Sequence, residues 1–79
     1  MNEKQKQYLE KHSSMFDCNE ETYQQDMKYN YIVLENGDYT KPLRFDNGLA
    51  VVYADIEEAK ALATLDDKIV TEEDYFNNL

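Results

Sequence analysis

The chain has 79 residues, with 17 acidic and 8 basic side chains and a formal net charge of −9. A chain of this length builds one small core, so we expect a single compact domain over residues 1–79 without a deep catalytic cleft. The shortage of Lys and Arg disfavours direct binding to nucleic acid, and no apolar run approaches the roughly 20 residues that cross a bilayer.

Two helices are predicted in the first third of the chain. The apolar side chains between residues 2 and 16 recur with helical spacing, at Tyr8, Leu9, His12, Met15 and Phe16. Asp17 followed by Glu20 matches a capping box, which predicts a second short helix over 18–28.

The middle of the chain predicts a three-stranded antiparallel β-meander. Alternating and apolar residues favour strands at 29–35, 39–45 and 49–54. Asn36-Gly37 and Asn47-Gly48 separate these segments, and Asn-Gly is typical of tight hairpin turns. We therefore expect Gly37 and Gly48 to have positive φ angles.

Helical signals return in the last third. Asp55 with Glu58 predicts a helix start, and Thr71 with Asp74 predicts a final helical turn. The β-branched segment 68–71 is a candidate for a short fourth strand. The expected fold class is α+β, a meander packed with N-terminal and C-terminal helices. The expected core is Leu9, Met15, Phe16, Ile32, Leu34, Leu43, Phe45, Val51, Tyr53, Ile56, Ala59, Leu62 and Ile69.

Catalytic and metal-binding chemistry finds little support in the sequence. His12 and Cys18 are the only His and Cys, and His12 lies on the apolar stripe of the first helix, where side chains pack. The single cysteine also excludes an internal disulfide and favours a reducing cytoplasm. The alternating run at Asp17, Asn19 and Glu21 lacks the later ligands of a calcium loop. We expect no enzymatic activity, no cofactor and no metal.

The acidic residues are unevenly distributed. Residues 46–79 hold nine acidic and two basic side chains, and five of the acidic ones crowd between positions 66 and 74. Acidic side chains suit helix N-termini, but such crowding is tolerated more readily when a basic partner relieves the repulsion. The acidic candidates for partner binding are Glu57, Glu58, Asp66, Asp67, Glu72, Glu73 and Asp74.

Tyrosine is also unusually frequent: the chain has seven Tyr residues and no Trp. We expect Tyr29, Tyr31 and Tyr39 to lie close together across the first hairpin, where they either brace the sheet or contact a partner. Tyr75 beside the acidic residues completes the set of partner-binding candidates.

In overall character the chain resembles small early proteins of bacteriophages and mobile elements, which are short, acidic and rich in Tyr, Asn and Lys. The Asn residues that fit this habit are Asn2, Asn19, Asn30, Asn36, Asn47, Asn77 and Asn78. The resemblance implies a cytoplasmic location in a bacterial host. It also implies inhibition of a host defence or replication protein, as anti-CRISPR proteins and other DNA mimics do.

The leading hypothesis is thus a non-enzymatic inhibitor whose acidic surface binds a basic, nucleic-acid-handling protein. An antitoxin or immunity protein that neutralises a basic toxin shares the same electrostatics and stays open as an alternative. A homo-oligomeric structural or assembly protein is the third, because an uncovered strand edge would favour self-association.

Overall fold

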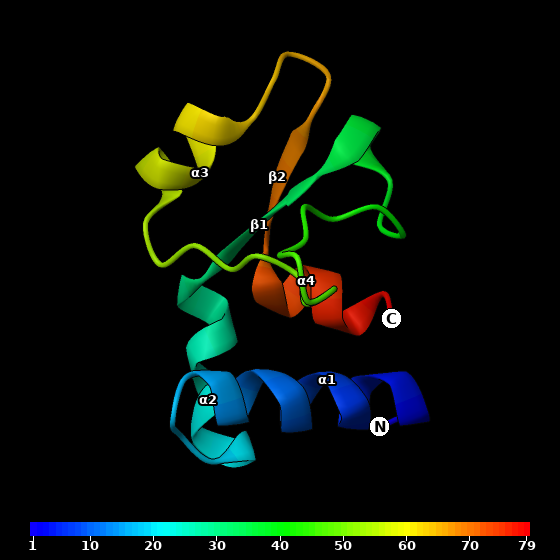
Figure 1. The fold of residues 1–79 in the computed structure, drawn as a ribbon, viewed down its shortest axis with the longest axis vertical. Coiled ribbons are helices and arrows are strands. Elements are labelled where there is room, and N and C mark those ends of the chain that lie inside the picture. The colour runs from blue at the N-terminus through cyan, green and yellow to red at the C-terminus, as the bar shows by residue number, and fades with distance from the viewer.

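In the computed structural model, which describes residues 1–79, the chain forms four α-helices and a two-stranded antiparallel sheet. The elements in chain order are α1 (Glu3–Met15), α2 (Glu20–Asp26), the 3-10 turn η1 (Met27–Tyr29), β1 (Tyr31–Leu34), the 3-10 turn η2 (Glu35–Gly37), α3 (Ile56–Leu62), β2 (Lys68–Thr71) and α4 (Glu72–Asn77). Figure 1 shows α1 at one end of the long axis and α3 at the other, with the sheet and α4 between them.

Polar side chains define where the first two helices begin. Asn2 and Gln5 form a reciprocal capping box at α1, with the Gln5 amide donating to the Asn2 side chain at 2.8 Å. Asn19 caps α2 by accepting from the Thr22 amide at 2.7 Å. The predicted cap at Asp17 is wrong, because this residue has a φ of 57° in the turn between the two helices.

The caps predicted in the last third are confirmed. The Asp55 side chain accepts from the Glu57 amide at 2.9 Å, and the Thr71 hydroxyl accepts from the Asp74 amide at 3.1 Å. Each side chain satisfies an amide that has no partner inside its helix. Helices α3 and α4 therefore begin where the sequence predicted.

The predicted three-stranded meander is wrong. The only strand that pairs continuously with β1 is β2, in the register Tyr31↔Thr71 to Leu34↔Lys68. The segments expected as strands at 39–45 and 49–54 make isolated bridges only, Leu34↔Pro42, Tyr31↔Tyr53 and Arg44↔Ala50. Residues 68–71, which the sequence allowed as a short additional strand, do form strand β2.

Turn geometry explains this difference. Asn36 and Gly37 do have positive φ angles, 55° and 73°, but they belong to η2 and do not close a two-residue hairpin. The chain meets β1 again at Pro42, where the Glu35 amide donates to the Lys41 carbonyl oxygen and the Leu43 amide donates to that of Val33. The Leu43 carbonyl oxygen then accepts from the Val51 amide, so the 39–45 segment leaves β1 after one bridge. Two short segments therefore share one edge of β1, while β2 occupies the other edge.

The core lies where α1, α2 and α4 meet the sheet. Its aromatic side chains are Tyr8, Tyr23, Tyr75 and Phe76, all at most 8% exposed. Of the predicted core, Leu9, Ile32, Leu34 and Ala59 are buried. The prediction is wrong for Met15, Phe16, Phe45 and Leu62, which are 39%, 48%, 44% and 58% exposed. Leu43, Val51, Tyr53, Ile56 and Ile69 are half-buried.

Candidate functional site

A buried carboxylate organises the interior. Glu72, at the start of α4, has no exposed surface. It accepts hydrogen bonds from the Tyr8 hydroxyl at 2.5 Å, from the Tyr23 hydroxyl and from the Asn30 amide at 3.0 Å. These donors come from α1, α2 and the segment before β1, so one side chain ties four parts of the chain together. Such charge-assisted bonds offset the large cost of burying a carboxylate.

The same cluster changes how its tyrosines titrate. Burial raises the pKa of Tyr8 and Tyr23 far above the usual tyrosine range, and the neighbouring Glu72 charge raises it further. Both phenols therefore stay protonated and keep donating. We interpret the cluster as a structural site, because the partner-binding role predicted for Glu72 needs an exposed side chain and Glu72 has none.

The acidic residues that are close together in the sequence, between positions 66 and 74, lie apart in the structure. Strand β2 separates Asp66 and Asp67 from the acidic residues of α4. Within α4, Glu72 points into the core, Glu73 faces α2 and η1, and Asp74 accepts from the Tyr39 hydroxyl at 2.6 Å. Consecutive helical residues point about 100° apart, so three adjacent acidic residues cannot share one face.

Asp67 has a local partner as well. Its side chain accepts from the Thr64 amide at 3.0 Å and closes the turn before β2, and this hydrogen bond holds the pKa of Asp67 below its usual value. Asp66 beside it is exposed. Asp66 thus points to solvent, while Asp67 is tied to the turn by Thr64.

The structure does not bring the tyrosine candidates together. Tyr29 is 72% exposed on η1, whereas Tyr31 on β1 is half-buried and forms a bridge with Tyr53. Tyr39 lies against α4 through Asp74, and this hydrogen bond raises the pKa of Tyr39. Tyr75 is 4% exposed in the core and is not available on the surface.

The segment from the cap of α3 to the turn before β2, residues 55–67, keeps most of its acidic side chains exposed, and we call it the α3 arm. It carries five acidic residues and one basic residue. Helix α3 packs on β1 with Ala59 fully buried, while Leu62 and Leu65 are 58% and 105% exposed. In Figure 1 the arm stands at the end of the molecule opposite α1.

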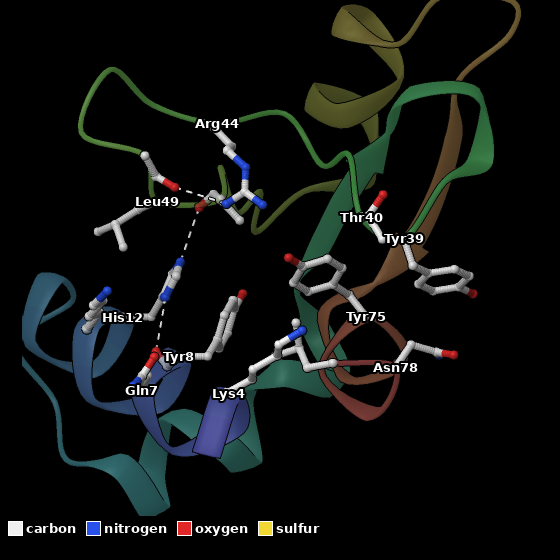
Figure 2. Close-up of a pocket in the computed structure, with 14 residues that line it drawn as sticks. Lys4, Gln7, Tyr8, His12, Tyr39, Thr40, Arg44, Leu49, Tyr75 and Asn78 are labelled. Carbon is white, nitrogen blue, oxygen red and sulfur yellow. Dashed lines mark hydrogen bonds between the residues drawn. The ribbon is translucent and has the colours of Figure 1, made fainter. Parts of the chain in front are cut away.

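A second feature is a hollow of about 440 Å³ between α1, residues 39–50 and the chain end after α4, which we call the cationic pocket. Lys4, Lys11 and Arg44 line it, and no acidic residue does. Figure 2 shows Arg44 reaching toward Tyr75 from one side and Lys4 from the other. Burial raises the pKa of Tyr75, and the nearby Arg44 opposes this effect.

His12 and Cys18 do not form a nucleophile–base pair in this structure. The two ring nitrogens of His12 lie 3.1 Å from the Tyr8 carbonyl oxygen and 3.2 Å from that of Ala50, and its ring stacks on Tyr8. Cys18 contacts the Ser13 carbonyl instead, at 3.8 Å. His12 thereby joins α1 to the segment at residue 50.

No three His, Cys, Asp or Glu side chains come together in a way that could hold a metal ion. None of the helices has the length and apolar character required to cross a membrane. Comparison with protein-family models, with curated proteins and with solved structures finds no match.

Sequence reasoning missed two sets of residues. Leu62 was placed in the core by its helical spacing, and Leu65 was not singled out, although it follows the helix and precedes two acidic residues. Lys4 and Lys11 share a face of α1 with Tyr8, a signal the sequence does contain. Arg44 lies at the same pocket because of the path that residues 39–50 take, and no local sequence pattern predicts that path.

Proposed function

We propose that this protein is a non-enzymatic inhibitor that binds a basic, nucleic-acid-handling protein through the α3 arm. The observation that carries the proposal is the exposure of Leu62 and Leu65 beside the exposed acidic residues Glu57, Glu58 and Asp66. An apolar centre supplies binding energy, and surrounding carboxylates attract Lys and Arg side chains and select the partner.

Exposed leucine is costly in water unless a partner covers it. Burying one leucine side chain contributes about 1.5–3 kcal/mol, so two exposed leucines on the arm can contribute to binding a partner. The acidic residues of the arm have only one local counter-ion, because Lys60 pairs with Glu57 at 3.5 Å and the other basic residues lie outside the arm. Their field is therefore available to a basic surface.

Site-specific photo-crosslinking tests this proposal. A photoreactive amino acid at position 65 is expected to capture a basic nucleic-acid-binding protein from host cells, and added nucleic acid should reduce the capture by competition. The same amino acid at position 45 is the matched control, because Phe45 is also exposed but lies outside the arm. Equal capture at both positions, or capture that nucleic acid does not reduce, would contradict the proposal.

One observation favours the alternative of self-assembly. Strand β2 pairs with β1 on one edge and has no neighbour on the other. Unpaired strand edges can join a second copy. A pairing of two β2 edges would, however, bring Asp66 and Asp67 of one copy toward Glu73 of the other, since the strands run antiparallel. Light scattering at high protein concentration distinguishes a self-assembling protein from a monomeric inhibitor, and we expect a monomer.

A further inference from the structure

We propose that the cationic pocket binds the phosphate group of a small phosphate monoester. The pocket is built from α1, residues 39–50 and the chain end, whereas the α3 arm spans residues 55–67. The two surfaces share no residue, so this inference stands apart from the proposed function and can fail or succeed independently.

The charged side chains around the pocket are positive, whereas the molecule as a whole is negatively charged. Lys4, Lys11 and Arg44 are three of only eight basic residues in a chain with 17 acidic ones, yet no acidic side chain lines the pocket. None of the three has an ion-pair partner, because the structure contains a single ion pair, Lys60 with Glu57. Three cations without counter-ions around one hollow favour a ligand with two negative charges, such as a phosphate monoester.

Arg44 is the residue best suited to hold the phosphate. One terminal nitrogen of its guanidinium group donates to the Gly48 carbonyl oxygen at 3.0 Å, which fixes the side chain over the hollow. The remaining N–H groups are free to donate to phosphate oxygens in the forked geometry that suits arginine. Lys4 and Lys11 stand about two helical turns apart on α1 and reach the hollow from the same side.

The floor of the pocket is formed before any ligand arrives. Tyr8, His12, Ala50 and Tyr75 are between 2% and 8% exposed, and the rings of Tyr8 and His12 stack with centroids 3.9 Å apart. The His12 ring nitrogens contact carbonyl oxygens of α1 and of residue 50, which holds both walls in place. Preformed walls reduce the entropy lost on binding.

Aromatic side chains complete the walls of the pocket. Tyr39 and Tyr75 line it, and Figure 2 shows the Tyr75 ring between Arg44 and Lys4. Tyr75 is only 4% exposed and the Tyr39 hydroxyl donates to Asp74, so the cations, and not the rings, are the groups that a ligand can reach. The volume of about 440 Å³ lies within the range of small-molecule sites.

Titration followed by amide NMR shifts tests this inference with phenyl phosphate as the probe. We expect saturable shifts at the amides of Gly48, Leu49, Ala50 and Asn78, which line the pocket. Phenol has the same ring without the phosphate and is the matched control probe. It should bind at least about fivefold more weakly than phenyl phosphate.

Charge-neutralising variants identify the site. Lys4→Gln with Lys11→Gln should weaken phenyl phosphate binding about tenfold, and adding Arg44→Gln should weaken it further. The matched control, Lys28→Gln with Lys60→Gln, removes the same charge away from the pocket and should leave the affinity unchanged.

Three results would overturn the inference. The first is a set of shifts that do not saturate or do not map to the pocket. The second is equal loss of affinity in both double variants, which would mean a non-specific charge effect. The third is phenol binding as tightly as phenyl phosphate, which would mean that the cations contribute nothing.

Discussion

Glu72 is the residue on which the interior depends most. Removing its carboxylate leaves the buried hydroxyls of Tyr8 and Tyr23 and the half-buried amide of Asn30 without their acceptor. A buried polar group without a partner costs about 1–3 kcal/mol, and three depend on this one side chain. The residue acts as a polar centre that fixes how α1, α2 and α4 meet.

We therefore expect Glu72→Ala to lower the free energy of unfolding by about 3–5 kcal/mol. Urea denaturation followed by circular dichroism measures this change. Glu73→Gln is the control, because Glu73 is adjacent in α4 but only half-buried, and it should change stability by no more than about 0.5 kcal/mol. Similar effects from the two substitutions would show that the buried cluster does not stabilise the fold.

The raised pKa values of Tyr8 and Tyr23 predict loss of stability in alkali. In the unfolded chain a tyrosine ionises near pH 10, whereas in the folded protein both phenols keep their protons. The folded state then binds more protons than the unfolded state, so stability is complete below pH 10 and falls as pH rises above it. Each phenol contributes a slope of about 1.4 kcal/mol per pH unit.

Urea unfolding between pH 8 and pH 11.5 measures this slope. Replacing Tyr8 or Tyr23 with Phe should make the decline shallower, because Phe has no proton to lose. It should also lower stability at neutral pH, because Glu72 loses a hydrogen-bond donor. A native protein whose stability is constant from pH 9 to pH 11.5 would be inconsistent with buried, hydrogen-bonded phenols.

At the level of elements, the two glycine turns set the path of the 35–50 segment. Gly37 and Gly48 have φ angles of 73° and 89°, as the sequence predicted. A methyl group at Gly48 would meet no atom within 4 Å, so the effect of Ala there is one of backbone conformation alone. We expect Gly48→Ala to destabilise the domain by about 1 kcal/mol or more.

Gly48→Asn is the matched control, because Asn tolerates positive φ better than Ala does. It should cost less than Gly48→Ala in thermal or urea unfolding. If the two substitutions cost the same, the left-handed conformation at residue 48 is not what stabilises the loop. The Gly48 carbonyl oxygen also accepts from Arg44, so the conformation of this turn helps to position Arg44 beside the cationic pocket.

Local signals predicted the helices better than the sheet. Caps such as Thr71 act within one turn, so the sequence around them is enough to place a helix start. Strand pairing is decided by distant segments. The Asn36-Gly37 signal correctly predicted two positive φ angles, but the partner of β1 came from residues 68–71, more than thirty positions away.

The surface was the hardest part to predict, since it depends on which side of each element is covered. Glu72, Glu73 and Asp74 are neighbours in sequence, yet one is buried, one faces α2 and one bonds to Tyr39. Leu62 has helical spacing suited to the core, but helix α3 is anchored by Ala59 on β1 and leaves Leu62 exposed.

At the scale of the whole molecule, two surfaces of opposite character lie on separate parts of the fold. The acidic, leucine-bearing α3 arm lies at one end of the long axis, and the cationic pocket lies beside α1 and α4. With a net charge of −9, long-range attraction to any basic protein is expected from the molecule as a whole. Only contacts specific to the arm distinguish the proposed function from this general attraction.

The association rate with the protein that position 65 captures is the most direct measurement. The arm variant Glu57→Gln, Glu58→Gln, Asp66→Asn is compared with Glu10→Gln, Asp26→Asn, Asp46→Asn, which removes the same charge from exposed positions elsewhere. We expect the arm variant to associate at least about tenfold more slowly at low salt and the control to stay near the native rate. Equal rates for the two variants would contradict the assignment of the interface to the α3 arm.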